Sequence, residues 1–162
     1  MNAALRAQLA RRIRVASPAD WAAFTQLWIA FNAIYGGEPD SGERARVMAS
    51  IRRNFSECSA LRVLRAVRKS VDKILQVPPG NMLLDMYNPN FRAASQRCAA
   101  LYRNRAETSV GRLAAVGGVI YQVRCNLVHG DKDPDNERDR MLITESLFVL
   151  QSLVPALEEQ LA

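Results

Sequence analysis

The chain has few of the residues that hold metals or form disulfide bonds. It contains a single histidine, His129, and three cysteines, Cys58, Cys98 and Cys125, which are odd in number and widely spaced. Such cysteines are typical of free thiols in a reducing compartment, and they lack the paired spacing of a structural zinc site. The sequence therefore predicts a cytoplasmic protein with neither a metal nor another cofactor.

Long apolar runs are also absent from the sequence. No uninterrupted stretch approaches the ~18 apolar residues of a membrane span, and no apolar run of the signal-peptide type follows the basic start. Apolar residues make up 49% and charged residues 23% of the chain, an ordinary balance for a soluble globular protein. We therefore expect a single domain over residues 1–162 that buries a core and has no membrane partner.

Basic residues outnumber acidic ones, which gives a formal net charge of +6, and arginine is far more frequent than lysine. A basic balance favours a polyanionic partner, and the planar guanidinium group suits phosphate. The alternative is a GC-rich genome that places arginine on any solvated surface. Charge alone does not separate these two interpretations.

Helical periodicity dominates the sequence, and no alternating strand pattern of useful length occurs. The accessory basic segment 1–16 is expected to form an amphipathic helix. The other helices are expected at about 18–35, 43–54, 57–76, 91–104, 108–129 and 136–160, with residues 81–90 irregular. The last helix is mostly apolar from Met141 to Val154, so it should lie deep in a bundle, and Pro155 is a candidate kink. The predicted fold class is all-α.

Aromatic residues recur at helical spacing in the first of these strongly patterned helices. Trp28, Phe31 and Tyr35 are predicted to be core residues, and the Gly36-Gly37 pair should end the helix. Asn32 lies among them. A buried amide at that position would need hydrogen-bond partners, so it is a candidate for bracing the helix at about 108–129 or for capping a loop.

Arg124 and His129 form a candidate pair for phosphodiester chemistry. A guanidinium group can hold two phosphate oxygens, and an imidazole can transfer a proton near neutral pH. On a helical wheel, Arg124 lies about 70° from the centre of the expected core face and His129 about 150° from it. A histidine on that side of the helix is not expected to be a core residue.

The spacing of five residues separates the two side chains by about 140° on a regular helix. Either the helix unwinds at Gly130, or a second copy of the helix completes the site. Small residues run along the His129 side of this helix, namely Gly111, Ala114, Gly118 and Cys125. They indicate either close packing within one bundle or a two-fold interface.

Two segments resemble the Apea-like branch of the HEPN superfamily. The segment Arg124-Cys125-Asn126-Leu127-Val128-His129-Gly130 resembles its R-x4-6-H motif, and Leu27-Trp28-Ile29-Ala30-Phe31-Asn32-Ala33-Ile34-Tyr35-Gly36 resembles its aromatic first-helix motif. The resemblance implies an up-and-down bundle of four to five core helices plus short accessory helices. It also implies a homodimer with the motif helices at the interface.

The resemblance implies a metal-independent endoribonuclease with Arg124 and His129 as catalytic residues and Asn126 as polar support. In that reaction the ribose 2′-OH attacks phosphorus and leaves 2′,3′-cyclic phosphate and 5′-OH ends. Active members often carry Asn, Asp or His after the motif arginine, whereas this chain has Cys125. By family analogy, the setting is a toxin or phage-defence system with an antitoxin or nucleotidyltransferase partner.

Two alternatives to an enzyme stay open. A catalytically silent HEPN domain would bind RNA or act as an adaptor, using Arg124 and basic residues of the N-terminal segment for phosphate contacts. A purely structural helical dimer would have no nucleic-acid role.

Overall fold

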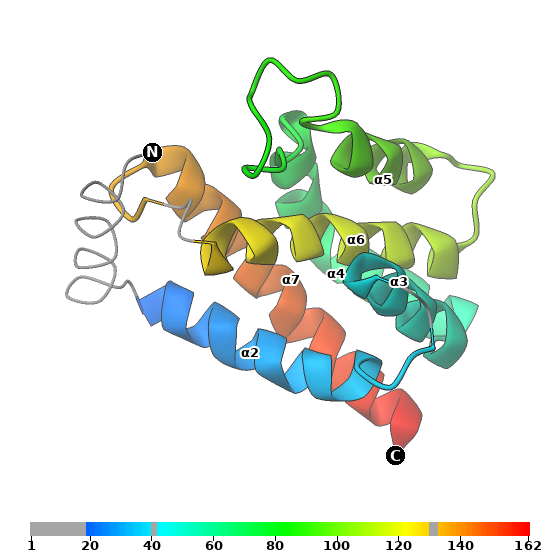
Figure 1. Ribbon diagram of the computed structural model, residues 1–162. Coiled ribbons are helices and arrows are strands. Elements are labelled where there is room, and N and C mark those ends of the chain that lie inside the picture. The colour runs from blue at the N-terminus through cyan, green and yellow to red at the C-terminus, as the bar shows by residue number, and fades with distance from the viewer. Residues whose placement is uncertain (1–18, 40–41, 130–132) are drawn as a thin grey trace.

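The computed structural model describes residues 19–39, 42–129 and 133–162 and shows a bundle of helices (Figure 1). Six helices account for 76% of these residues, and none of them is in a strand. The helices are α2 (Ala19–Tyr35), α3 (Glu43–Asn54), α4 (Glu57–Gln76), α5 (Ala93–Arg103), α6 (Ser109–Val128) and α7 (Glu137–Leu161). The predicted all-α class is confirmed. The accessory helix expected within residues 1–16 lies outside the described residues.

Polar caps set where three of the helices begin. Ser56 accepts a hydrogen bond from the Ser59 backbone N–H at the start of α4, Thr108 does so for Gly111 of α6, and Asn136 does so for Asp139 of α7. These side chains satisfy backbone donors that have no partner within the helix. The helix bounds follow the expected ranges within about two residues because such caps and breakers are local sequence signals.

Helix α6 is the central helix of the bundle and packs against α3, α4 and α5 (Figure 1). Leu113, Val116 and Ile120 are buried, as expected for its core face. Val119 and Gln122, on other sides of the helix, are buried as well. The expectation of a single core face on this helix is therefore wrong, because neighbouring helices cover most of its circumference.

The small residues of α6 are used inside the bundle. A Cβ atom at Gly118 would lie 2.9 Å from Cys98 Sγ of α5 and 3.1 Å from Met48 Sδ of α3. At Gly117, a Cβ atom would lie 2.6 Å from Ile51 Cδ1 of α3. At Gly118 the stripe therefore packs within the bundle, which is one of the two alternatives that the sequence leaves open.

Glu57, at the start of α4, holds the beginning of α6 from outside the helix. Its carboxylate accepts hydrogen bonds from the backbone N–H groups of Ser109 and Val110, at 2.8 and 3.1 Å. The bond from Val110 is the largest cause that lowers the pKa of Glu57. This contact fixes the position of α6 relative to α4.

Helix α7 packs between α2 and α4 and carries the apolar run expected of a deep helix. Leu150 and Leu153 are fully buried, and the helix continues through Pro155. Helix α7 is the one helix among the described residues that is long and apolar enough to cross a membrane, but 56% of its most apolar window is buried within the bundle.

The aromatic residues of α2 form part of the core, as predicted. Trp28, Phe31 and Tyr35 are at most 4% exposed, and the Phe31 and Tyr35 rings meet edge to face with centroids 5.0 Å apart. Asn32, in contrast, is exposed. The expectation of a buried amide that braces the helix at 108–129 is wrong, because the residue lies on the outer side of α2.

Gly118→Leu should destabilise the monomeric fold. The added side chain meets Cys98 and Met48 with no space to enter, and overpacking of this kind costs roughly 1–3 kcal/mol. Thermal melting should show a lower Tm. Gly37→Ala is the matched control, because no heavy atom lies within 4 Å of a Cβ built there. A Gly118→Leu protein that kept its Tm and changed only its oligomeric state would contradict the packing described here.

Candidate functional site

Arg124 lies where the end of α2, the start of α3 and the second half of α6 meet. Its Nη1 atom is 3.3 Å from Oε2 of Glu43, and both side chains are about one-quarter exposed. The Tyr35 hydroxyl donates to the other oxygen of Glu43 at 2.6 Å. Burial, together with this hydrogen bond, raises the pKa of Tyr35, so its hydroxyl remains a donor at neutral pH. Glu43 is therefore held between a phenol and a guanidinium group.

His129 is the residue that ends α6. It is exposed, and its backbone N–H still donates to the Cys125 carbonyl at 3.0 Å with near-helical φ and ψ angles of −77° and 2°. Within the described part of the chain, no side chain bonds to its imidazole. Its exposure agrees with the predicted position away from the core. Gly130, the expected point of unwinding, lies outside the described residues.

Arg124 and His129 are not brought together by a contact within one chain. The helix stays regular up to its last residue, so the two side chains keep the divergent directions set by a five-residue spacing. Arg124 is directed to Glu43 instead. A site that used both groups on one phosphate would need a second chain or a local rearrangement.

Asn126 is a buried residue with a fully engaged amide. It is 2% exposed, its Nδ2 donates to the Gly80 carbonyl at 2.8 Å, and its Oδ1 accepts from the Met82 N–H and from Gln122 Nε2. Asn126 is therefore a residue of the interior and not of the surface. In this arrangement Asn126 binds the segment after α4 to the second half of α6.

The hydrogen bonds of Asn126 extend through Gln122 to Arg44 of α3. Arg44 Nη2 donates to Gln122 Oε1, and its guanidinium carbon lies 5.3 Å from the centre of the Tyr121 ring. Sequence reasoning missed Arg44, Gln122 and Glu43. The spacing of Gln122 and Asn126 on one helix was an available signal, since residues four apart are neighbours, but nothing in the sequence pointed to α3 as their partner.

Cys125, the residue that follows the motif arginine, is half-buried beside Tyr121. Burial, and after it the hydrogen bond with Cys125, raises the pKa of Tyr121. Tyr121 therefore remains protonated at neutral pH and adds no negative charge near Arg124.

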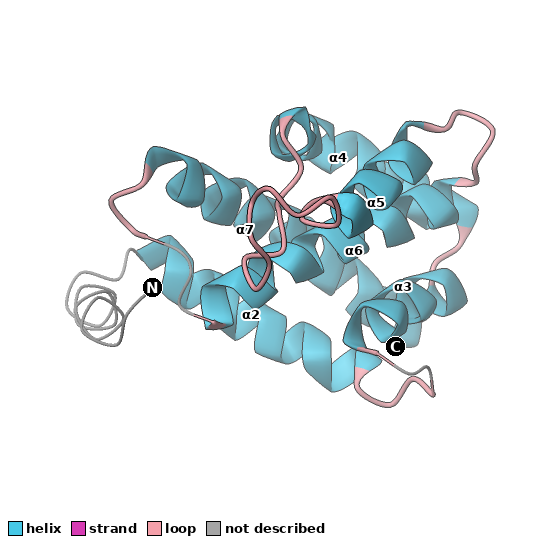
Figure 2. Cartoon of the chain, turned by 45° about the horizontal axis from the view of Figure 1, so that its top comes forward, coloured by secondary structure: helices cyan, strands magenta, loops and turns pink. Residues whose placement is uncertain are grey.

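The segment between α4 and α5 forms a long loop beside α6 (Figure 2). Its inner end is fixed by Asn126 and by Arg92, whose Nε donates to the Pro78 carbonyl at 3.1 Å. Its outer part exposes four large apolar side chains, namely Met82, Leu83, Met86 and Tyr87. The loop is thus anchored at its base and apolar at its tip.

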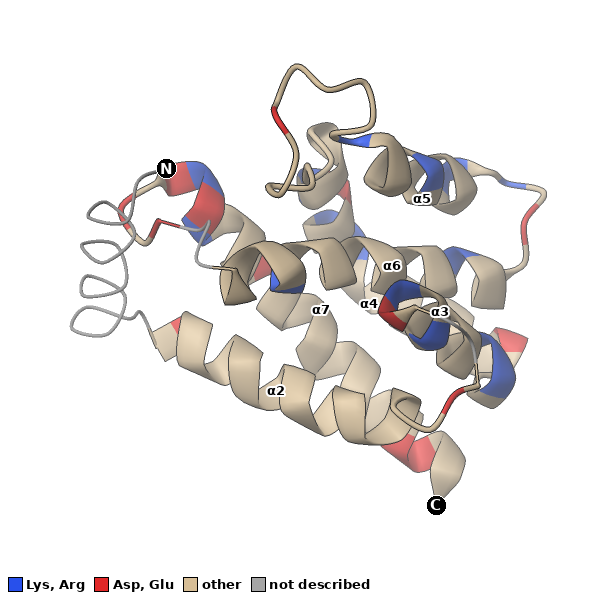
Figure 3. Cartoon of the chain, in the orientation of Figure 1, with Lys and Arg blue, Asp and Glu red and all other residues tan. Residues whose placement is uncertain are grey.

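Charge is distributed unevenly over the described helices (Figure 3). Helix α2 carries Asp20 and no other charged residue, whereas arginine and lysine gather on α3, α4 and α5. Among the described residues, no group of three or more His, Cys, Asp or Glu side chains is placed to hold a metal ion.

No protein-family model, curated protein or solved structure matches this chain. Function is therefore inferred from the residues and contacts described above.

Asn126→Ala should release the loop after α4. The change leaves the Gly80 carbonyl and the Met82 N–H without their partner, and an unsatisfied buried group costs about 1–3 kcal/mol. Hydrogen exchange should show faster exchange of the Met82 amide, together with a lower Tm. Asn32→Ala, at an exposed position, should change neither quantity. Unchanged exchange at Met82 would show that Asn126 does not anchor the loop.

Proposed function

We propose that the chain is a HEPN-like, metal-independent endoribonuclease of the cytoplasm in which Arg124 and His129 act on the phosphodiester. The observation that supports this most directly is the position of His129. It is exposed at the end of a helix that is otherwise mostly buried, and no described side chain engages its imidazole. A histidine in that position has no packing role, which favours a chemical one.

The proposed reaction uses the 2′-hydroxyl of RNA as nucleophile. The 2′ oxygen forms a bond to phosphorus, the bond from phosphorus to the 5′ oxygen breaks, and the products are a 2′,3′-cyclic phosphate and a 5′-OH. The attacking hydroxyl gives up a proton and the leaving oxygen gains one, and His129 is the group proposed for one of these transfers. Arg124 would stabilise the charge on the phosphate oxygens.

Glu43 has a positioning role in this proposal. Its ion pair with Arg124 is only partly shielded from water, since both side chains are about one-quarter exposed. A phosphodiester carries the same single negative charge as the carboxylate but offers the guanidinium two oxygens, and the neighbouring phosphates of an RNA chain add to the attraction. RNA binding would therefore replace the carboxylate on Arg124, and Glu43 would keep the guanidinium in place until then.

The proposed assembly is a homodimer in which the C-terminal ends of two α6 helices meet. The middle of α6 is covered by α3 and α5, whereas its last turn is partly open. Val128, beside His129, is 60% exposed. Joining two such ends would bring Arg124 of one copy toward His129 of the other, which the divergent directions within one chain do not allow.

The second candidate function is a catalytically silent RNA-binding or adaptor module. The ion pair between Arg124 and Glu43 favours it, because a paired arginine is less available to a transition state. The engagement of the Asn126 amide within the fold favours it as well. In either case, an antitoxin or nucleotidyltransferase partner in a toxin or phage-defence setting is proposed by analogy alone.

Purified protein should cleave labelled RNA in excess EDTA and leave 2′,3′-cyclic phosphate ends. His129→Ala should abolish cleavage, yet its stability should stay within ~0.5 kcal/mol of wild type because the side chain is exposed. Arg124→Lys keeps the positive charge but loses the planar guanidinium group with its paired donors, so this variant should bind RNA and cleave it poorly. Product analysis measures cleavage, fluorescence anisotropy measures RNA binding, and thermal melting measures stability.

Mixing two inactive variants tests the shared site. Arg124→Ala and His129→Ala chains should each be inactive, and the mixture should recover part of the activity if one copy supplies the arginine and the other the histidine. Equal cleavage by wild type and His129→Ala would indicate a contaminating nuclease. Salt-sensitive RNA binding without any product would establish the silent module instead.

Glu43→Gln should strengthen RNA binding. Removing the carboxylate charge frees Arg124 from its ion pair, and RNA no longer has to displace it. The amide can still accept the Tyr35 hydroxyl, so the local structure should be kept. Anisotropy with single-stranded RNA should give a Kd several-fold lower than wild type, and the double variant Glu43→Gln/Arg124→Ala should lose the gain. Weaker binding by Glu43→Gln alone would show that Glu43 positions Arg124 in the complex as well.

A further inference from the structure

A groove lined by arginine lies away from the candidate site, between α4, the end of α5 and the start of α6. It has a volume of about 400 Å³. Its charged lining residues are Arg65, Arg68, Arg103, Arg105, Arg112 and Asp72. Five guanidinium groups against one carboxylate leave a net charge of +4 in a small concave space.

Little inside the fold neutralises these guanidinium groups. Arg103 and Arg112 donate to the backbone carbonyls of Leu75 and Tyr102, which hold the side chains in position without cancelling their charge. Arg65 and Arg105 are exposed, and within the described ranges neither makes a hydrogen bond or ion pair. The groove thus combines two arginines that are fixed by hydrogen bonds to backbone carbonyls with two arginines that make no hydrogen bond or ion pair within the described residues.

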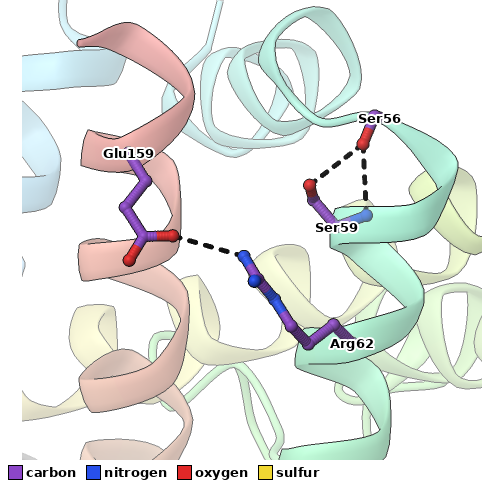
Figure 4. A network of polar contacts seen from close by, with 4 residues as sticks. All are labelled: Ser56, Ser59, Arg62 and Glu159. Carbon is purple, nitrogen blue, oxygen red and sulfur yellow. Dashed lines mark hydrogen bonds and ion pairs between the residues drawn. The ribbon is translucent and has the colours of Figure 1, made fainter.

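A neighbouring arginine of α4 shows the contrast. Arg62 turns away from the groove toward α7, where its Nη2 lies 3.2 Å from Oε2 of Glu159 (Figure 4). In the groove, the corresponding acidic partner is Asp72 alone, 3.8 Å from Arg68 and shared with the Tyr102 hydroxyl. Arg62 is therefore paired with an acidic residue of another helix, whereas the arginines of the groove share a single carboxylate.

The aromatic residue of the groove is not available for stacking. Tyr102 is 6% exposed, and the guanidinium of Arg112 lies over its ring at 5.2 Å from the centroid. Stacking of bases on aromatic rings is the usual way in which single-stranded nucleic acid is held by its bases. A groove with arginine and no free ring suits the backbone phosphates instead, which arginine binds through paired hydrogen bonds.

We propose that this groove is a second RNA-binding site, which holds backbone phosphates of a single-stranded RNA without reading its sequence. The choice of RNA as the polyanion rests on the proposed function. Arg112 and Arg124 are twelve residues apart on α6, so the groove lies about 18 Å along the helix from the candidate catalytic arginine. RNA bound in the groove would be held at a distance from the phosphate that is cleaved.

The experiment measures binding of a fluorescent, mixed-sequence single-stranded RNA over a series of salt concentrations. All proteins carry His129→Ala, so that the RNA stays intact. Arg65→Ala/Arg105→Ala removes the two unoccupied groups. Arg52→Ala/Arg97→Ala is the matched control, because it removes the same charge from exposed positions on α3 and α5 outside the groove.

The groove variant should bind about 25-fold more weakly at 0.1 M salt, and its salt slope should fall by about 1.4, the amount for two phosphate contacts to a single strand. RNA binding by the control variant should weaken by less than about threefold, because this variant loses only a long-range attraction that salt screens. Arg65→Lys/Arg105→Lys should lie between the two. Both pairs of positions are exposed, and equal Tm values verify that every variant is folded.

Three results would overturn the proposal. Equal weakening by the groove variant and the control would assign RNA binding to overall charge, and no weakening by either would exclude the groove. Tighter binding of poly-L-glutamate than of RNA would assign the groove to an acidic protein. The proposed catalysis is tested separately. If the protein binds RNA through the groove but shows no cleavage that depends on His129, the groove proposal stands and the endoribonuclease proposal is wrong.

Discussion

The close approach of α3 and α5 to α6 is the contact on which the rest of the bundle depends. It is possible because Gly117 and Gly118 carry no Cβ atom where Ile51, Met48 and Cys98 press against the helix. Glycine within a helix costs roughly 1 kcal/mol in intrinsic propensity, so α6 is a weak helix by itself and is stabilised by its neighbours. Its central position decides which parts of the motif helix are buried and which reach water.

Local signals in the sequence were enough to predict where the helices lie, but not which helices pack around each of them. Ser56 and Thr108 begin helices by chemistry that acts over a few residues, and the Gly36-Gly37 pair, which was predicted to end a helix, follows the last residue of α2. The environment of α6 was mispredicted because the wheel assumed one core face. A helix covered by three others and a helix with one core face can have the same sequence pattern, if the second face of the latter carries small, uncharged residues.

The candidate site was predicted in part for the same reason. The exposure of His129 follows from its register and was foreseen, whereas the ion pair of Arg124 joins residues 81 positions apart and leaves no periodic trace. Asn126 is similar, because its partners outside α6 are backbone groups of a loop and any sequence could supply them.

The anchoring of the loop after α4 by Asn126 has a consequence for synthesis of the chain. The Gly80 carbonyl is made 46 residues before the amide that it will accept from. At the usual speed of translation this interval lasts roughly 2–9 s. Through that time the apolar side chains of Met82, Leu83, Met86 and Tyr87 belong to a segment without its anchor. During synthesis the chain therefore contains an exposed apolar segment before the helix that anchors it has been made. Such a segment is a binding site for holdase chaperones.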